Sequence, residues 1–151
     1  MAAWLKKMPS QRIGQASRDA LEQVGLTERA DSRLRSLSGG MLRRAGIAQA
    51  IVHRPRLLIL DEPSAGLDPQ QRIGLRRLIG RLAASSSVLL STHLVDDVGV
   101  VADRIIVLDQ GQVSFSGTSA ELAGRDRPGA EGDSPLERGY SAVLGRRPDE
   151  L

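Results

Sequence analysis

The stretch Leu57-Leu58-Ile59-Leu60-Asp61-Glu62-Pro63 decides the fold of this chain. It consists of an apolar run, residues 57–60, that ends in two adjacent carboxylates and a proline. An apolar run of this length bounded by a turn predicts a fully buried strand. Because carboxylates are rarely buried without partners, we expect Asp61 and Glu62 at the C-terminal end of that strand, facing a crevice. Open α/β sheets bind their ligands at this place.

Composition limits the classes of protein that this chain can form. At 151 residues it is one ordinary domain or a piece of a larger one. A hydrophobic fraction of 40% with one Trp, one Tyr and one Phe predicts an aliphatic core. The lack of cysteine excludes disulfides and thiolate metal sites. Since no apolar run approaches the roughly 18 residues of a membrane span, we expect a soluble, cytoplasmic protein.

The charge pattern argues against nucleic acid as a partner. The net charge is +3, from 21 basic and 18 acidic residues. The arginine pairs, such as Arg43-Arg44 and Arg76-Arg77, are scattered along the chain and are not grouped with aromatic residues. This pattern favours solvated helix faces over a nucleic-acid surface.

Periodicity predicts an α/β fold with a mainly parallel sheet, because strands alternate with helices. Asp68-Pro69 supplies an N-cap and a proline at the first helical position. The helix that begins there is expected to bury Ile73 among other residues, and Thr118 and Glu121 form a capping box. We expect helices over 17–24, 41–52 and 94–102 as well, and strands over 57–60, 87–91, 104–108 and 112–115.

The acid pair itself allows two interpretations. An aspartate at a strand tip can hold magnesium through its water shell, and the glutamate after it can orient and polarise an attacking water. Asp61 and Glu62 would then serve a magnesium-nucleotide hydrolase. The alternative is a structural acid pair that caps the following turn.

Leu37-Ser38-Gly39-Gly40-Met41 lies where a polar loop becomes a helix. Glycines allow a ligand to approach the backbone closely, and the first amides of a helix are unpaired donors at its positive end. The Ser38 hydroxyl adds a further donor, so the segment suits phosphate binding. Taken alone, the same residues are also explained as a simple helix cap.

Two more polar residues are candidates for the site. His93 follows the expected strand 87–91, again near a C-terminal strand end, where it could contact a transferring phosphate or the attacking water. A lone histidine is often structural instead. Asp68 is explained as the N-cap of its helix, and a second role at a ligand is compatible with that.

The order and spacing of these pieces closely resemble the ATP-binding cassette (ABC) ATPases over about residues 17–122. Residues 37–41 resemble the signature motif, 57–62 the Walker B strand with its catalytic glutamate, and 65–68 the D-loop. His93 is similar to the switch histidine. The resemblance implies a partial P-loop NTPase-like domain with part of the helical subdomain. It also implies ATP and Mg²⁺ as cofactors.

The resemblance assigns a role to each of these residues. Glu62 activates water, Asp61 serves magnesium and His93 senses the γ-phosphate. The remaining residues would contact the nucleotide of a partner: Ser38, Gly39, Gly40 and Asp68.

The stretch Ser64–Pro69 resembles the transporter branch of the family more than its translation or chromosome-associated members. Met41 resembles bacterial export cassettes. The expected partners are a second ABC ATPase domain, paired head-to-tail, and separate transmembrane permease subunits. These would hold the protein at the inner face of the cell membrane, without nucleic acid.

One family element has no counterpart in this sequence. The phosphate-binding loop needs a lysine in G-x-x-x-x-G-K-[ST], and lysine occurs only at positions 6 and 7. A glutamine loop is also missing. The chain therefore resembles the C-terminal portion of a cassette, and we expect a truncated ATPase. The alternative is a degenerate, non-hydrolytic half-cassette that completes or regulates a partner's ATP site.

The same resemblance gives the expected domain organisation. Residues 1–123 form the partial ATPase domain, with the helical subdomain at 1–54 and the Walker B, D-loop and histidine portion at 55–123. Residues 124–151 are expected to be a flexible tail, rich in Gly, Pro, Arg and Asp. Strands 87–91 and 104–108 would lack the neighbour that lies between them in the family, so we expect marginal stability for the isolated chain.

Overall fold

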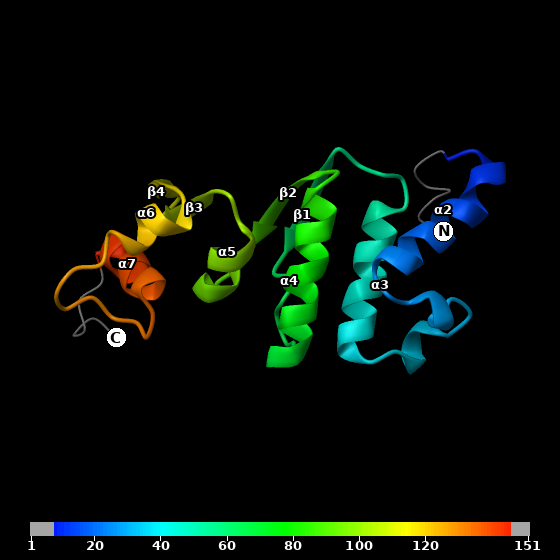
Figure 1. Cartoon of the computed structure of the whole chain (residues 1–151), viewed down its shortest axis with the longest axis horizontal. Coiled ribbons are helices and arrows are strands. Elements are labelled where there is room, and N and C mark those ends of the chain that lie inside the picture. Colours follow the sequence, from blue (N-terminus) through cyan, green and yellow to red (C-terminus); the bar gives the residue numbers. More distant parts are fainter. Residues whose placement is uncertain (1–7, 146–151) are drawn as a thin grey trace. The chain divides into compact units, whose positions relative to one another are not determined.

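A computed structural model of the chain describes residues 8–145. The chain divides into two compact units, Met1–Ser91 and Thr92–Leu151. Figure 1 labels their helices and strands. Each unit has its own cluster of buried apolar side chains.

The first unit begins with helical segments. Helix α2 spans Ser10–Gln23. It begins seven residues before the start that the periodicity predicted. Two short 3-10 helices follow at Thr27–Arg29 and Leu34–Ser36, and α3 spans Gly39–Ile51. Contacts between α2 and α3 place these helices side by side.

A parallel pair of strands completes the first unit. Strand β1 spans Leu57–Asp61, α4 spans Pro69–Ala83 and β2 spans Ser87–Ser91. The two strands pair in parallel, with Asp61 opposite Ser91. As the sequence predicts, Asp68 is the N-cap of α4: its carboxylate accepts a hydrogen bond from the amide of Gln71 at 2.8 Å.

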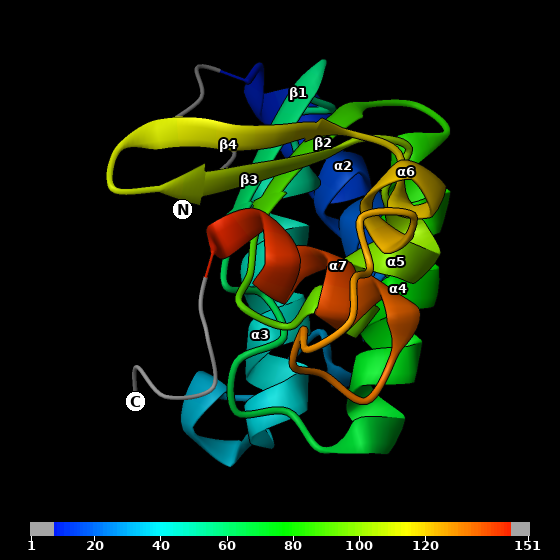
Figure 2. The ribbon, with the colours of Figure 1, turned by 90° about the vertical axis from the view of Figure 1, so that its left-hand side faces the viewer.

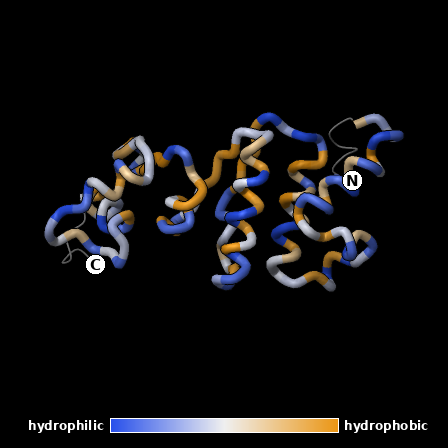
Figure 3. The backbone as a smooth tube through the Cα atoms, viewed as in Figure 1, coloured by the Kyte–Doolittle hydropathy of each residue, from blue (hydrophilic) through white to orange (hydrophobic). Residues whose placement is uncertain are grey.

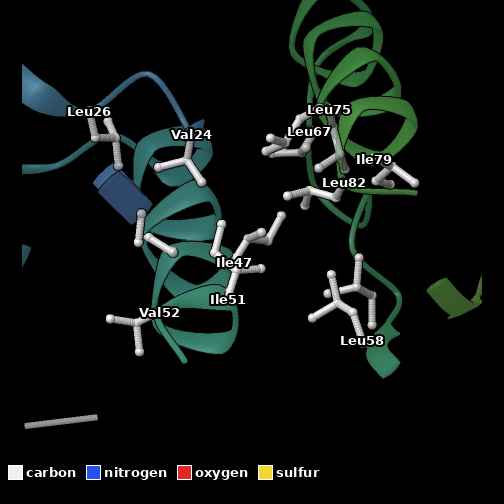
Figure 4. Close-up of a cluster of buried hydrophobic side chains, with 14 residues drawn as sticks. Val24, Leu26, Ile47, Ile51, Val52, Leu58, Leu67, Leu75, Ile79 and Leu82 are labelled. Atoms are coloured by element: carbon white, nitrogen blue, oxygen red, sulfur yellow. The ribbon is translucent and has the colours of Figure 1, made fainter. Parts of the chain in front are cut away.

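Aliphatic side chains from both helices and strands form the core of this unit. In Figure 4, Ile47 and Ile51 of α3 lie on one side of this core and Leu75 and Leu82 of α4 on the other. Leu78 is 2% exposed. Burying one such side chain is worth about 1.5–3 kcal/mol, so this shared core helps to hold α3 and α4 in one unit.

The strands of the first unit are not fully buried, which corrects the expectation from the apolar run. Burial alternates along β1: Leu58 and Leu60 are buried, whereas Leu57 is 54% and Ile59 65% exposed. Figure 3 shows the hydrophobic stretches where β1 and β2 run. The described helices cover one face of this sheet, so alternate residues lie on the uncovered face. Ile73 of α4, expected in the core, is also 42% exposed.

The second unit contains an antiparallel hairpin. Helix α5 spans Val95–Val101, and β3 (Ile105–Asp109) and β4 (Gln112–Gly117) pair around a turn at residues 110–111. Figure 2 shows β3 and β4 as a two-stranded ribbon. Gln110 and Gly111 have φ values of +47° and +79°, as two-residue hairpin turns require. The hairpin prediction is confirmed.

Helix α6, Ser119–Ala123, follows the hairpin. The predicted capping box is present: the amide of Thr118 donates to the Glu121 carboxylate at 2.7 Å, and the amide of Glu121 donates to the Thr118 hydroxyl at 3.2 Å.

The structure differs from the flexible tail expected over 124–151. Residues Pro135–Leu144 form helix α7, opened by a second capping box between Ser134 and Glu137. The helix packs on α6 and α5, and a Cβ at Gly139 would overlap the carbonyl oxygen of Leu122. The overlooked signal was Ser134-Pro135 with a glutamate three residues after the serine. The rest of the predicted tail, 146–151, lies outside the described residues.

Parallel strands joined by a helix, with further helices against them, confirm the α/β fold. In the described part of the chain, β2 pairs only with β1, and β3 only with β4. The boundary between 1–54 and 55–123 stays a prediction. Over residues 8–145, no helix has both the length and the apolar character to cross a membrane.

Candidate nucleotide site

The acid pair lies at the C-terminal end of β1, as the sequence predicts. Asp61 is the last residue of the strand and is exposed, and Glu62 is half-buried. Glu62 has a φ of +43°, in the left-handed region that costs a residue with a Cβ roughly 1–2 kcal/mol. Such strain occurs where the surrounding structure holds the backbone in place. Here the neighbouring strand does so.

Ser91, the last residue of β2, holds both acids. Its hydroxyl donates to Oδ1 of Asp61. The amide of Glu62 donates to the Ser91 hydroxyl and to its carbonyl oxygen, each at 3.1 Å. Ser91 therefore fixes the orientation of the Asp61 carboxylate and the backbone of Glu62. Sequence reasoning assigned Ser91 no role, although its position beside His93 at a strand end was the available signal.

Ser38 to Gly40 form the start of α3. Ser38 is the N-cap, and its hydroxyl accepts from the amide of Met41 at 3.3 Å. Gly40 is buried, and a Cβ there would lie 2.8 Å from the side-chain oxygen of Gln71. A larger residue at this position would therefore displace the end of the Gln71 side chain.

The segment that precedes α4 and contains Asp68 also contacts α3. The guanidinium of Arg43 donates to the carbonyl oxygen of Ala65 at 3.3 Å. The side chain of Gln71 approaches Gly40, and the backbone amide of Gln71 donates to the Asp68 carboxylate. The fold thus brings the Ser38–Gly40 segment and the residues before α4 together. The sequence motifs alone did not indicate this contact.

His93 lies in the second unit, in the turn that precedes α5. It is exposed. The hydroxyl of Thr92 accepts from the amide of Leu94 at 3.1 Å, which closes a local turn with His93 at its centre. The turn presents the imidazole on the surface of this unit.

The donor set suits magnesium bound together with a nucleotide. Among residues 8–145 there is no group of three or more His, Cys, Asp or Glu side chains that could hold a metal ion alone. Magnesium usually takes one or two carboxylates and completes its shell with water and substrate phosphates. With Oδ1 of Asp61 hydrogen-bonded to Ser91, the other carboxylate oxygen fits that single-carboxylate role.

Comparisons with known proteins agree with these motifs. Residues 6–65 match the family model described as ABC transporter. The chain is 44% identical over 130 residues to the aliphatic sulfonates import ATP-binding protein SsuB of Pseudomonas putida, covering 85% of this chain and 47% of that protein. It is 41% identical to the linearmycin resistance ATP-binding protein LnrL of Bacillus subtilis, covering 71% of this chain and 35% of that protein.

A solved structure supports the same relationship. That structure is cbiO1 from Clostridium perfringens, described as part of the ABC transporter complex cbiONQ. It matches with a TM-score of 0.72 and 30% identity, over 78% of this chain and 47% of that chain. This chain therefore spans about half the length of the relatives it matches. Motifs, fold and relatives agree: the chain belongs to the ATP-binding proteins of the ABC transporter family.

Proposed function

We propose that this chain is part of the ATP-hydrolysing subunit of an ABC transporter, which couples ATP hydrolysis to transport across a membrane. The observation that carries the proposal is the acid pair of β1 held by Ser91, in a chain of this family. Carboxylates fixed at a strand end can act on a nucleotide without first reorganising.

In this proposal each site residue has a separate task. Glu62 accepts a proton from, and so orients, the water that attacks the γ-phosphate. Asp61 would hold Mg²⁺, whose charge would offset the negative charge of the phosphates. His93 contacts the γ-phosphate.

The signature residues act on the nucleotide of a second ABC ATPase domain, paired head-to-tail. The amides at the start of α3, at Gly39 and Gly40, and the Ser38 hydroxyl donate to its phosphates. Asp68 lies near these residues, because the side chain of Gln71 approaches Gly40 and the backbone amide of Gln71 donates to the Asp68 carboxylate. Separate permease subunits would carry the cargo and hold the protein at the inner face of the membrane. Met41 favours an exporter, although the relatives include an import protein as well as a resistance protein.

A second candidate function has its own observation. This sequence holds no phosphate-binding loop, since lysine occurs only at positions 6 and 7. A non-hydrolytic half-cassette would offer the Ser38–Gly40 surface to the ATP of a partner. Such a role rests on the Ser38–Gly40 segment at the start of α3 and does not need Glu62.

Hydrolysis by the purified 151-residue chain separates the two functions. Mg²⁺-dependent release of phosphate from ATP by the chain, lost in Glu62→Gln, is the result that would exclude the non-hydrolytic half-cassette. Glu22→Gln, an exposed change on α2, is the matched control and should leave hydrolysis unchanged. Hydrolysis that appears only after an ABC ATPase domain with a phosphate-binding loop is added, and that survives Glu62→Gln, would favour the half-cassette. Equal hydrolysis by Glu62→Gln would remove Glu62 from the catalytic role.

A further inference from the structure

The second unit contains a cleft that none of the nucleotide motifs reaches. Its volume is about 580 Å³, within the range of ligand-binding clefts. It is lined by residues 113–116 of β4, by Arg125 and Arg127, and by Ala142 and Val143 of α7. All of these residues belong to one compact unit.

One wall of the cleft is the edge of a strand. Consecutive side chains of a strand point to opposite faces, so a cleft lined by four consecutive residues runs along the strand edge. Strand β4 pairs with β3 on one side, and within residues 8–145 no strand pairs with its other side. Such an edge carries unpaired N–H and C=O groups. It can therefore accept an additional extended chain.

Two further lining residues of the cleft are positively charged. Arg125 and Arg127 are both exposed. Arg125 also attracts the carboxylate of Glu121, whereas Arg127 has no ion pair among the described residues. The Ser116 hydroxyl accepts from the Arg104 side chain at 3.2 Å, so its own proton is available to an acceptor. The polar groups of the cleft thus favour carboxylates.

Apart from Ser114, the remaining lining is apolar. Val113 is 61% exposed, and Ala142 and Val143 contribute the side of α7. A segment that adds to β4 would place alternate side chains on opposite sides. Its apolar side chains would meet the apolar part of the lining, and its acidic side chains would meet the arginines.

We propose that this cleft binds an extended acidic peptide segment of a partner protein, by addition of a strand to the free edge of β4. Main-chain hydrogen bonds to β4 hold the segment, and Arg125 and Arg127 select its carboxylates. The assignment is independent of ATP, because no residue of the nucleotide site lines the cleft.

Peptide titration of the full chain tests this proposal. The probe is a blocked pentapeptide of alternating valine and glutamate, added to ¹⁵N-labelled chain while amide shifts are followed by NMR. We expect saturable shifts centred on residues 113–116. A peptide with lysine in place of glutamate and one with methylated backbone nitrogens should each bind at least about tenfold more weakly, since they lack the charge or the strand hydrogen bonds.

Variants supply the second measurement. Because exposed charge pairs are individually weak, the double variant Arg125→Ala/Arg127→Ala should weaken binding of the glutamate peptide by roughly tenfold. Arg77→Ala, an exposed arginine of α4, should not change it. If the double variant fails to fold, the methylated and unmethylated peptides still decide the matter on the unchanged chain. Equal binding of these two peptides, the same shifts from free glutarate, or no shifts at millimolar peptide would each overturn the proposal.

Discussion

Ser91 is the residue on which the geometry of the acid pair depends. One hydroxyl group bridges the Asp61 carboxylate and the amide of Glu62, across a separation of about 30 positions in sequence. The amide of Glu62 also reaches the Ser91 carbonyl oxygen. Removing the hydroxyl leaves the strands paired but frees the carboxylate.

Replacing Ser91 by alanine should lower the free energy of unfolding by about 1 kcal/mol, the usual net worth of such hydrogen bonds. Urea unfolding followed by circular dichroism measures the change. Ser91→Thr keeps a hydroxyl and should retain most of the stability. An alanine variant as stable as the threonine variant would show that the hydroxyl contributes nothing.

Glu121 gives the second unit a pH-dependent contact. Hydrogen bonds from the Thr118 amide and hydroxyl, with smaller attraction from Arg104 and Arg125, lower the pKa of the Glu121 carboxyl. A lowered folded-state pKa stabilises the fold above the ordinary glutamate value. This stabilisation is lost as the pH falls through the lowered pKa.

An NMR titration of the Glu121 carboxyl carbon should therefore have its midpoint below that of an ordinary glutamate. In Thr118→Ala, which removes the hydroxyl, the midpoint should move up. The protection of the α6 amides against hydrogen exchange, corrected for the intrinsic pH dependence of exchange, should decrease at low pH in the unchanged chain. A midpoint at or above the ordinary glutamate value would contradict the capping contact.

At the scale of elements, α7 decides how the second unit packs. Its capping box starts the helix locally, but its position depends on two close approaches. Leu136 lies against Gly99 of α5, and Gly139 lies against the backbone of α6. Leu122, at 0% exposure, is the centre of this packing.

Gly139→Ala should destabilise the second unit by about 2 kcal/mol, because the new methyl overlaps the Leu122 carbonyl and α7 must shift. Hydrogen exchange of the α6 and α7 amides measures the effect. Gly80→Ala in α4 is the control: a Cβ there meets nothing within 4 Å, so alanine should stabilise by up to about 1 kcal/mol. Destabilisation of similar size at both positions would argue against the tight contact at Gly139.

At the scale of the whole molecule, apolar surface is left uncovered in both units. In the first unit, Leu57, Ile59 and Leu89 lie on the exposed face of the β1/β2 sheet. In the second, Ile106 and Leu108 of β3 are 54% and 69% exposed. Exposed apolar faces beside strand edges are prone to self-association. The marginal stability expected from the sequence stays a prediction.

Ile59→Thr should reduce self-association of the chain, because it removes apolar surface and retains a β-branched side chain. Light scattering over a range of concentrations measures this effect. Leu58→Thr, on the buried face of the same strand, should instead destabilise the fold. If Ile59→Thr unfolds the chain as readily as Leu58→Thr does, the two faces of β1 do not differ as described.

The sequence by itself determined the local features of this protein. Strand β1 with its terminal acids, the Asp68 cap of α4 and the hairpin turn at residues 110–111 each depend on a few neighbouring residues. Local propensity and hydrogen bonding decide such features. The family also followed from the order of the motifs.

Tertiary structure alone decided the rest. Ser91 bonds to the acid pair, although these residues lie far apart in the sequence. Helix α7 docks at Gly139, a position that no periodic pattern marks. Burial along β1 alternates because the described helices cover one face of its sheet. The apolar run alone does not tell whether one face of the strand or both faces are covered. Which groups meet depends on the sum of many packing contacts, and no single segment of sequence carries that information.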